Sequence, residues 1–432
     1  MGIHEEMRVH VRGAPPGAVV RVAPFKKKKG ELHARRLELV EPPPNAQPPR
    51  CAVFGLCGGC SLQELTLAAQ RDAKHAMVLR EMGSLDGVEV HDILGPDEGY
   101  GYRNKVELTF GVSQYMSEAD KDAGVAIDGT FLGFHAPGRF DRVVDAERCE
   151  LVPEGLNRVI ETVRAHTSAF ANWNVREHTG FWKHLVLRET TKGQRLVAFY
   201  TAEPPEGAAA ELAALAEDID ADGVLWFVNA GVADVAQGRL QAVLKGHETI
   251  EEVLGPVTYQ LSATAFFQTN TEGAVCLYDV IAKVTGGGKR LLDLYCGTGA
   301  IGLYLADRFE EVYGIELNLN SVEDARQNAL RNRRQVTYVA GPVEKNLPEL
   351  RPGDVAVVDP PRAGLHPKVA AFLATAPLQR LVYVACKPSS LARDRVILEE
   401  GGWRLVELHT VDLFPQTTHV EAVGLFIRAE PS

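Results

Sequence analysis

The sequence predicts an α/β protein whose C-terminal part is a doubly wound, Rossmann-like domain. From about residue 256, apolar strands alternate with amphipathic helices, a pattern typical of a parallel sheet covered by helices. A glycine-rich turn, Gly297-Thr-Gly-Ala-Ile-Gly302, joins the first of these strands to its helix. Because 432 residues exceed one ordinary domain, we expect further domains upstream.

Residues 8–40 read as short strands separated by turns such as Gly13-Ala-Pro-Pro-Gly17. They predict a small β-barrel of the OB type over residues 1–48, with a hairpin that bears the lysine run Lys26 to Lys29. The stretch Glu41-Pro-Pro-Pro-Asn-Ala-Gln-Pro-Pro49 sustains neither helix nor sheet ladder, so it predicts a semi-rigid linker and a domain boundary.

Residues 51–255 have a mixed pattern and predict an α+β central domain, and residues 256–432 predict the Rossmann-like domain. In the central domain we expect strands at Lys105–Phe110 and His184–Arg188, and helices at Leu156–His166 and Ala208–Asp218. In the last domain we expect strands at Arg290–Tyr295, Glu311–Glu316, Gln335–Ala340, Val355–Asp359 and Leu381–Ala385, and helices at Ala300–Arg308, Asn320–Arg331, Pro367–Ala376 and Ser390–Glu400.

Charge is distributed unevenly along the chain. The net charge is −11, which by itself counts against a phosphate-bound nucleic acid. Residues 1–50, however, hold ten Arg and Lys against five Asp and Glu, a local net of +5 that leaves −16 for the other 382 residues. A basic first module on an acidic body favours a nucleic-acid partner. No signal peptide or long apolar span occurs, which predicts a cytoplasmic protein without a membrane partner.

The glycine-rich turn and Glu316, which ends the next strand, suit either a dinucleotide or S-adenosylmethionine, because a carboxylate there accepts hydrogen bonds from ribose hydroxyls. The choice comes from Asp359-Pro-Pro-Arg362, at the carboxyl edge of the sheet where ligands of such folds bind. A methyltransferase that acts on amines would favour Asn at this position. We therefore expect S-adenosylmethionine and a nucleophile other than an exocyclic amine.

Cys386 ends the fifth strand and precedes a helix, and both the helix N-terminus and Lys387 are expected to favour its thiolate. Carbon 5 of uracil is a poor nucleophile until a thiolate adds to carbon 6, so a cysteine is a chemical requirement for its methylation. A base must then remove the proton from carbon 5. Glu421 is the favoured candidate, and His419, expected two residues away on the same strand face, is the alternative.

These residues resemble the RNA 5-methyluridine methyltransferases, in particular the branch that acts on ribosomal RNA and carries an iron–sulfur cluster. The matching segments are Tyr102-Arg-Asn-Lys105, Phe267-Gln-Thr-Asn270, Asp293-Leu-Tyr-Cys-Gly297, Asp359-Pro-Pro-Arg-Ala-Gly364, Cys386-x-Pro, Phe414-Pro-Gln-Thr-x-His-Val-Glu421 and four cysteines, Cys51, Cys57, Cys60 and Cys149. The first 50 residues resemble an RNA-binding TRAM domain.

The resemblance implies a class I methyltransferase domain in which Gln268, Tyr295, Glu316 and Asp359 contact S-adenosylmethionine. It implies Cys386 as nucleophile, Glu421 as base, and stacking of Phe266 on a flipped-out uracil. Two departures are Lys387, where the family often has Asn, and Pro342, where an acidic residue that contacts adenine is common.

The seven cysteines, an odd number in a chain without a secretion signal, are expected to be reduced, metal-bound or catalytic. Cys51, Cys57, Cys60 and Cys149 supply four thiolates, which suit either zinc or a [4Fe–4S] cluster. Spacing does not separate the two, and the resemblance implies iron. The spacing lacks the C-x3-C-x2-C run of radical enzymes, so the cluster is expected to be structural or to help hold RNA, without a role in methyl transfer.

Three other functions remain as alternatives: a non-catalytic RNA-binding protein, an NAD-dependent oxidoreductase and an amine-directed RNA methyltransferase. The first needs neither Cys386 nor Glu421, and the second leaves both unexplained. Ribosomal RNA is the favoured substrate, with transfer RNA as the alternative. One chain holds all the catalytic groups, so we expect a monomer.

Overall fold

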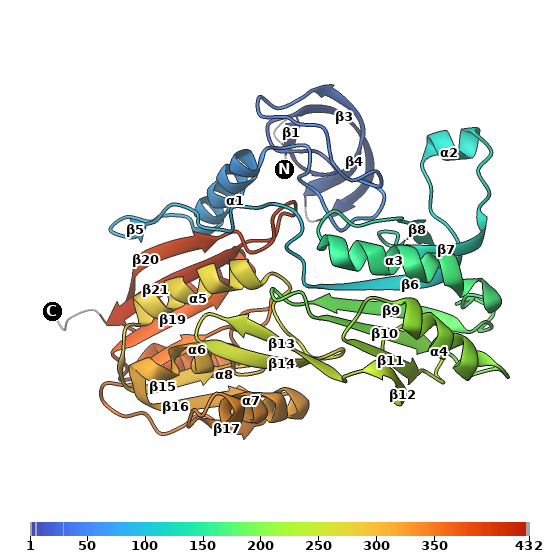
Figure 1. Cartoon of the computed structure of the whole chain (residues 1–432). Helices are drawn as coiled ribbons and strands as arrows, with labels where there is room; N and C mark the ends of the chain where they lie inside the picture. Colours follow the sequence, from blue (N-terminus) through green and yellow to red (C-terminus); the bar gives the residue numbers. More distant parts are fainter. Residues whose placement is uncertain (1, 5–6, 29, 429–432) are drawn as a thin grey trace.

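The structure, a computed structural model, describes residues 2–4, 7–28 and 30–428. Lys29, the last residue of the lysine run, lies outside these ranges. Within them the strands form sheets of four, seven, two and eight strands. Figure 1 shows the N-terminal sheet above two larger layers, the central sheet on one side and the C-terminal sheet on the other.

The N-terminal module is a four-stranded sheet in the order β1-β2-β4-β3. Its strands are β1 (Gly2–His4), β2 (Met7–Arg12), β3 (Val19–Lys28) and β4 (Glu31–Glu41). The exposed Lys26, Lys27 and Lys28 end β3 at the predicted hairpin. The predicted linker is pinned at two points, because Ala46 forms a β-bridge with Leu65 and Gln47 N donates to Glu64 O at 2.9 Å.

The central domain is a seven-stranded sheet in the order β12-β11-β10-β9-β6-β7-β8. Its strands are β6 (Lys105–Ser113), β7 (Asp128–His135), β8 (Val143–Asp145), β9 (Trp182–Glu189), β10 (Arg195–Thr201), β11 (Gly223–Val228) and β12 (Arg239–Gly246). Its helices are α2 (Glu118–Asp122), α3 (Glu154–His166) and α4 (Ala208–Asp218). Both predicted strands and both predicted helices are confirmed. The apolar faces of α3 and α4 pack on the sheet around Trp182.

The C-terminal domain contains the predicted doubly wound sheet, in the order β17-β16-β15-β18-β19-β21-β20-β5. Its later strands are β15 (Gly288–Leu294), β16 (Phe309–Glu316), β17 (Thr337–Ala340), β18 (Val355–Val358), β19 (Arg380–Ala385), β20 (Trp403–Val411) and β21 (Glu421–Arg428). Its helices are α5 (Thr271–Thr285), α6 (Ala300–Leu305), α7 (Leu319–Arg331), α8 (Pro367–Thr375) and α9 (Pro388–Glu400). The predicted elements are confirmed to within a few residues at each end.

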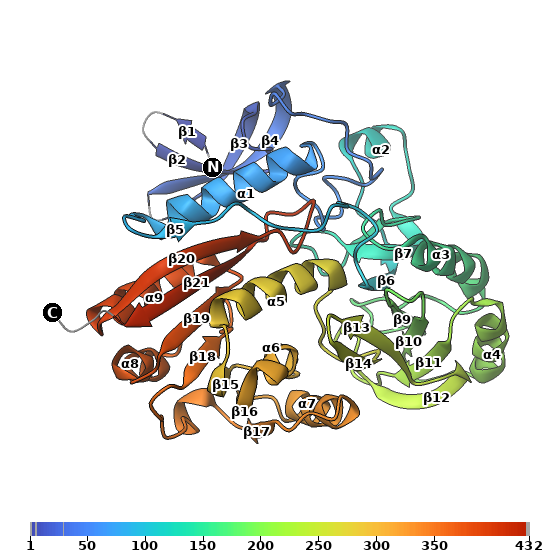
Figure 2. The ribbon, with the colours of Figure 1, turned by 60° about the vertical axis from the view of Figure 1, so that its left-hand side comes forward.

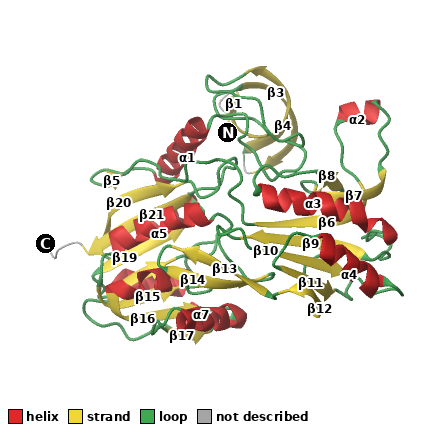
Figure 3. Ribbon diagram, viewed as in Figure 1, coloured by secondary structure: helices red, strands yellow, loops and turns green. Residues whose placement is uncertain are grey.

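The two faces of this sheet pack against different helices: Figure 2 shows α5, α6 and α7 on one side and α8 and α9 on the other, and Figure 3 distinguishes helices from strands by colour. Odd-numbered residues of β15 and β18, such as Leu291 and Val357, share a core with α5, α6 and α7. Their even-numbered neighbours, such as Leu292 and Ala356, share a second core with α8 and α9. Side chains alternate along a strand. Odd-numbered residues at the ends of β15 and β18 therefore point to the α5 side, and even-numbered residues point to the α8 side.

Two segments before residue 256 pack with the C-terminal domain. Helix α1 (Leu67–Met82) buries Val78 and Met82 in the core under α8 and α9, and β5 (Glu89–Val90) extends the sheet beside β20. Figure 2 shows α1 between the N-terminal sheet and β20. The boundary expected at residues 255 and 256 falls in the turn of a hairpin, between β13 (Thr249–Leu254) and β14 (Val257–Ser262).

Candidate active site

The carboxyl edge of the parallel strands gathers the predicted site residues. Tyr295 follows β15, Glu316 ends β16, Asp359 follows β18 and Cys386 follows β19. The strand order places β15 and β18 side by side with their connections leaving in opposite directions. This is the switch point at which open α/β sheets bind ligands.

Cys386 and Glu421 face each other across two antiparallel strands. The ladder between β19 and β21 pairs Ala385 with Ala422, and one further step of the same register sets Cys386 opposite Glu421. Their strand neighbours of the same parity, Val384 and Val423, pack in the core under α5. Both side chains therefore point to the α5 side of the sheet.

Asp293 and Asp359 share this face, because Leu291 and Val357 belong to the same core. Burial raises the pKa of Asp359 to about 7. The pKa of Asp293 is also raised to about 7, chiefly by burial, against the lowering effect of the Gly302 N–H that it accepts at 2.8 Å. Burial and then Asp359 raise the pKa of Glu421 well above its usual range, and Arg362 opposes them. The three carboxyl groups thus lie in a site that favours a bound cation or a proton.

The glycine-rich turn holds Glu316 in place. Tyr295, Gly297 and Gly299 all have positive φ angles, of 65°, 54° and 75°, which let the chain turn sharply before α6. Gly297 N donates to Glu316 Oε2 at 3.1 Å, and Asn318 N donates to Oε1 at 2.8 Å. Each oxygen keeps a lone pair for a further donor such as a ribose hydroxyl.

Gln268 reaches the same site from the loop before α5. Its side chain hydrogen-bonds Tyr278, whose pKa is raised mainly by burial and also by Asp359 and Asp293. The Gln268 carbonyl accepts from Asn104 Nδ2 at 2.9 Å. The Tyr102-Arg-Asn-Lys105 segment therefore ties the central domain to the loop that carries Gln268.

The expectation that the surroundings of Cys386 favour its thiolate is contradicted by the structure. Burial, then Glu421 and Asp359, raises the pKa of the thiol, and Arg362 opposes them. Lys387, the N-cap residue of α9, is exposed. Burial is the largest cause, and the two carboxylates add to it because they share the buried face with the sulfur, whereas the lysine reaches solvent.

His419 differs from its expected position. Strand β21 begins at Glu421, so His419 lies in the preceding loop, where its side chain is partly exposed to solvent and partly covered. Its Nδ1 lies 3.5 Å from Arg362 Nη2, and burial followed by the charge of Arg362 lowers its pKa. The structure therefore brings Glu421, and not His419, onto the strand opposite Cys386.

Hydrogen bonds from α1 and from the segment after Cys60 clamp the loop from Phe414 to Glu421. The sequence did not predict these contacts. Gln416, at φ 68°, donates its N–H to Gln70 Oε1 at 2.8 Å and accepts from Gln70 Nε2 at 2.9 Å. The Gln416 carbonyl accepts from Ser61 N at 2.8 Å and from Leu62 N at 3.0 Å. Glutamines in a helix and a loop carry no sequence signal that links them, since they lie 346 residues apart.

A buried ion pair adds to this clamp. Lys74 Nζ pairs with Asp412, and it donates to Phe414 O at 3.0 Å. The side chains of Lys74 and Asp412 are 1% and 0% exposed. Tyr102 Oη donates to Pro415 O at 2.9 Å from the other side. The loop that leads to Glu421 is therefore fixed by partners from three distant segments.

The four predicted metal ligands meet around one cavity of about 530 Å³. All four thiols are half-buried and unpaired as disulfides. Burial, with contributions from the neighbouring cysteines, raises the pKa of Cys57 to about 11 and that of Cys60 to about 12. Gly58 has φ 76°, and a Cβ there would meet Pro137 at 2.4 Å, so the chain requires glycine at this turn.

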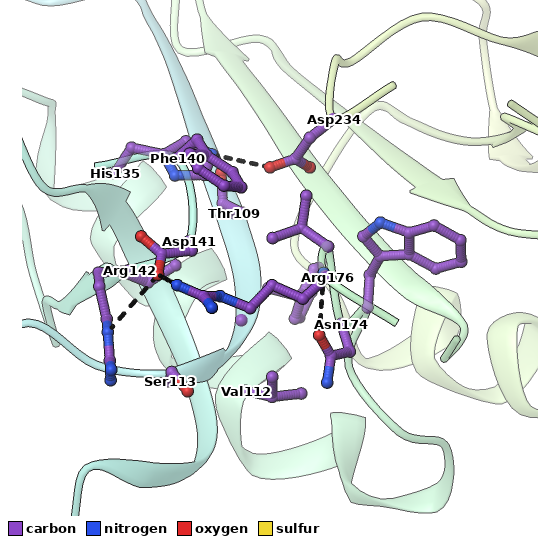
Figure 4. A pocket seen from close by; sticks show the side chains of 15 residues that line it. Thr109, Val112, Ser113, His135, Phe140, Asp141, Arg142, Asn174, Arg176 and Asp234 are labelled. Atoms are coloured by element: carbon purple, nitrogen blue, oxygen red, sulfur yellow. Dashed lines mark hydrogen bonds and ion pairs between the residues drawn. The ribbon is translucent and has the colours of Figure 1, made fainter. Parts of the chain in front are cut away.

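A second, smaller pocket of about 80 Å³ lies in the central domain (Figure 4). Asp141 accepts from Arg139 at 3.0 Å and from Arg176 at 2.5 Å, and these arginines lower its pKa. Asp234 pairs with His135 at 3.1 Å and with His184 at 3.0 Å. The acidic groups of this pocket are paired in place, so we assign no chemistry to it.

The fold and the site define a class I methyltransferase that uses S-adenosylmethionine, and comparisons with known proteins agree. The family described as tRNA (Uracil-5-)-methyltransferase matches residues 228–340 and 350–430. An uncharacterized RNA methyltransferase of Chlorobaculum tepidum is 36% identical over 99% of this chain and 92% of its own length. One of Clostridium acetobutylicum is 32% identical over 99% of this chain and 94% of its own.

Among solved structures, the Pyrococcus abyssi tRNA (uracil-54, C5)-methyltransferase in complex with S-adenosyl-L-homocysteine superposes with a TM-score of 0.76 at 28% identity. The match covers 96% of this chain and 95% of that one. The chain belongs to the RNA uracil-5-methyltransferase family and is an S-adenosylmethionine-dependent enzyme. This membership decides against an oxidoreductase, an amine-directed methyltransferase and a non-catalytic platform. In the described part of the chain, no helix is long and apolar enough to cross a membrane.

Proposed function

We propose that this enzyme methylates carbon 5 of a uridine in structured RNA, with ribosomal RNA as the favoured target, and that Cys386 and Glu421 carry the reaction. The Cys386 sulfur adds to carbon 6 of the uracil and loses its proton, which makes carbon 5 nucleophilic. S-adenosylmethionine would supply the methyl group to carbon 5 and leave as S-adenosylhomocysteine. Glu421 then takes the proton from carbon 5, the bond between sulfur and carbon 6 breaks, and 5-methyluridine leaves with a net release of one proton.

The observation that carries this proposal is the register of β19 against β21, which sets Cys386 and Glu421 opposite each other on one face. A ring that is attacked at carbon 6 by one and deprotonated at carbon 5 by the other must lie between them. The raised pKa of Glu421 supports its role as proton acceptor, because an environment that favours the protonated carboxyl makes the carboxylate a stronger base.

The proposed contacts to S-adenosylmethionine are Gln268, Tyr295, Glu316 and Asp359. The hydrogen bonds that orient Glu316 and the position of Asp359 at the switch point support this assignment. Phe266, 69% exposed beside Gln268, is proposed to stack on the extruded uracil. Pro342 ends the loop after β17 without a charge, so the adenine contact that an acidic residue makes elsewhere in the family is left out of the proposal.

RNA that contains 5-fluorouridine tests the covalent step, because the base cannot remove fluorine and the adduct persists. The native chain should form a protein–RNA adduct that survives denaturation. Cys386→Ala should form none, lose all methylation and still bind S-adenosylmethionine, whereas the control Cys276→Ala, on α5, should behave as the native chain. With ordinary RNA, Glu421→Gln should accumulate the adduct. An adduct in Cys386→Ala would remove the covalent mechanism.

The target is tested with unmodified ribosomal and transfer RNA transcripts, labelled S-adenosylmethionine and nucleoside analysis. We expect 5-methyluridine from ribosomal RNA, in keeping with the resemblance of the cysteine set to that branch. 5-Methyluridine from transfer RNA alone would reassign the substrate and leave the chemistry intact. We further propose that the chain acts as a monomer.

We also propose that Cys51, Cys57, Cys60 and Cys149 hold a [4Fe–4S] cluster. In a tetrahedral zinc site, sulfurs bound at ~2.3 Å lie ~3.8 Å from one another. No three of the four cysteine sulfurs lie within 4.8 Å of one another. In the described residues, the one group of three or more potential ligands that meets this limit is His91, Glu407 and His409. The wider spacing and the large cavity favour a bulky cluster, and its iron would compensate the four thiolates.

Anaerobic purification tests the cluster through the visible spectrum and through iron and sulfide content. About four irons per chain are expected from a [4Fe–4S] cluster, with loss of colour in Cys60→Ser and retention in the control Cys276→Ser. A colourless chain that holds one zinc would overturn the assignment.

The N-terminal sheet is proposed to be a TRAM-like module that binds RNA through its exposed lysines. Replacing Lys26, Lys27 and Lys28 together by Gln should weaken RNA binding and reduce its dependence on salt, because fewer counterions are released. An unchanged salt dependence would contradict this role.

A further inference from the structure

Three arginines and an exposed aromatic ring surround the smaller pocket of the central domain. Phe140 and Arg142, on the turn between β7 and β8, line this pocket together with Arg176 from the loop before β9. Phe140 is 67% exposed, and the side chains of Arg176 and of Arg139, which precedes Phe140, are 66% and 45% exposed. We call these four residues the arginine–aromatic patch. A large apolar ring thus faces solvent among three cations.

One buried carboxylate holds the arginines of the patch in place. Asp141, whose side chain is 4% exposed, accepts from Arg139 Nε at 3.0 Å and Nη2 at 3.1 Å, and from Arg176 Nη2 at 2.5 Å. Arg142 Nε lies 4.0 Å from the same carboxylate, and Figure 4 shows Asp141 between Arg142 and Arg176. Hydrogen bonds from Arg139 and Arg176 lower the pKa of Asp141, so it stays ionised. Three cations around one anion leave an excess of positive charge at this point of the surface.

The ion pairs occupy only part of the binding capacity of the two exposed guanidinium groups. A guanidinium carries several N–H donors in one plane; Arg139 uses two of them on Asp141, and Arg176 uses one. The other donors suit the oxygens of a phosphate group, which arginine binds in the same forked geometry. The exposed Phe140 ring suits the flat face of a base that is not paired. The patch therefore combines the two kinds of group that bind single-stranded nucleic acid.

The patch is joined to the methyl-transfer site by the cysteine cavity. His135, at the end of β7, lines both the smaller pocket and the cysteine cavity. Pro137 of the following turn lies against Gly58 of the cysteine segment. The cavity is also lined by Thr269, which follows Gln268 in the chain. One continuous surface therefore leads from the loop of Gln268 to the arginine–aromatic patch.

Strand β6 indicates how long this surface is. Lys105 at its start lines the cysteine cavity, and Ser113 at its end lines the smaller pocket. The strand has nine residues, which at ~3.4 Å per residue span ~27 Å from the first to the last. Several nucleotides of an extended RNA strand fit along such a length.

Charge favours RNA over a protein segment as the partner of the patch. The chain has a net charge of −11, and the acidic excess lies outside the first 50 residues. A local excess of positive charge on an acidic body attracts a polyanion. The surface also leads to the site at which a uridine is proposed to react, which no protein segment would require.

We propose that the arginine–aromatic patch binds a single-stranded segment of the RNA that flanks the target uridine, with one base stacked on Phe140 and phosphates on Arg139 and Arg176. This inference rests on the proposed function, because it gives the RNA on which the catalytic residues act a second point of attachment. The patch takes no part in the methyl transfer itself. It favours RNA whose flanking nucleotides are unpaired, and so contributes to the choice of substrate.

RNA binding is measured by fluorescence anisotropy of the full chain, over a series of salt concentrations, with a labelled oligouridylate of about 20 nucleotides. Phe140→Ala should raise the Kd ~5-fold or more without changing its dependence on salt, because a stacked base is lost and no phosphate contact is. Phe140→Trp should keep the native Kd. Arg176→Gln should lower the slope of log Kd against log salt concentration by ~0.7, the value for one phosphate contact to a single strand.

Two matched controls lie on the C-terminal domain. Leu330→Ala changes an apolar side chain of α7 that is 71% exposed, and Arg351→Gln changes an arginine whose side chain is 60% exposed and paired with Glu311 at 3.0 Å. Both should bind the oligouridylate as the native chain does. A native Kd and a native salt dependence in Phe140→Ala and Arg176→Gln would overturn the proposal.

Methylation of an unmodified ribosomal RNA transcript, measured in parallel, separates this inference from the proposed function. A native chain that forms 5-methyluridine, with native RNA binding in both patch variants, refutes the patch alone. Weakened RNA binding in the patch variants of a chain that methylates neither ribosomal nor transfer RNA refutes the proposed function and leaves the patch.

Photocrosslinking needs no variant and so does not depend on folding of a mutant. An oligonucleotide that contains 5-iodouridine crosslinks to aromatic side chains in contact with its bases, and mass spectrometry locates the product. We expect a crosslink on Phe140. Crosslinks confined to other segments of the chain would refute the stacking.

Discussion

Replacing Gln70 by Ala tests whether the clamp on the Phe414-to-Glu421 loop controls catalysis. Gln70 is 0% exposed and Gln416 is 1% exposed. The Gln70 amide donates to Leu65 O at 2.8 Å and to Gln416 Oε1 at 2.9 Å, and it accepts from Gln416 N at 2.8 Å. Alanine removes all three bonds at once and leaves three buried groups without partners.

Each buried group that loses its partner costs ~1–3 kcal/mol. Water that enters the vacated space recovers part of this, so we expect the free energy of unfolding to fall by ~2–4 kcal/mol. The control is Gln327→Ala on α7, an exposed helical glutamine bonded only through Glu323 at 2.9 Å. Because it is exposed, it should change stability by less than ~0.5 kcal/mol.

Two assays separate the local effect from a general one. Urea denaturation measures the stability loss, and methylation kinetics at saturating S-adenosylmethionine measure kcat. Gln70→Ala should lower kcat while the affinity for S-adenosylmethionine stays native, because the glycine-rich turn is held by other bonds. A variant whose stability lies within ~0.5 kcal/mol of the native value, or one that loses cofactor affinity and kcat in parallel, refutes the argument.

Three further predictions follow from buried charge and backbone strain. Asp412→Ala should lower the free energy of unfolding, measured by urea denaturation, by ~3–5 kcal/mol, because it leaves the buried Lys74 charge without its partner. The double change Lys74→Met with Asp412→Leu should lower it by less, because no buried charge remains. Equal losses in the two variants would contradict the ion pair. For Asp359, burial raises the pKa from its usual value of 3.8 to about 7. The ionised carboxylate therefore destabilises the fold increasingly as the pH rises between these values, and by a constant amount above them. Asp359→Asn should therefore gain stability relative to the native chain as pH rises from about 4 to 7, and a pH-independent difference in unfolding free energy would argue against the raised pKa. Gly299→Ala should weaken S-adenosylmethionine binding, measured by calorimetry, about tenfold or more. The residue has φ 75°, and a Cβ there would lie 2.3 Å from the Tyr338 hydroxyl, so the turn would have to move. A native Kd would show that the turn tolerates a side chain.

The alternation of strands and helices from β15 to α9 could be predicted because it depends on local patterns of apolar residues. The same holds for the glycine-rich turn, whose spacing follows from the backbone it must form. The limits of the domains were harder to predict from the sequence. Helix α1 and β5 precede the central domain in the chain yet pack on the last sheet, and a two-residue strand has no periodicity to detect.

The chemical types at the site could be read from the sequence: a cysteine and a carboxylate at strand ends, a carboxylate beside the glycine-rich turn, and four cysteines in one region. Their electrostatics and alignment depend on the folded chain. Tertiary structure aligned Glu421 with Cys386 through a strand register and left His419 in a loop. It raised the pKa of Cys386 through burial and, after burial, through Glu421 and Asp359. It also joined Gln70 to Gln416 across 346 residues. Such contacts depend on which distant segments meet, and a pattern within one segment carries no information about that.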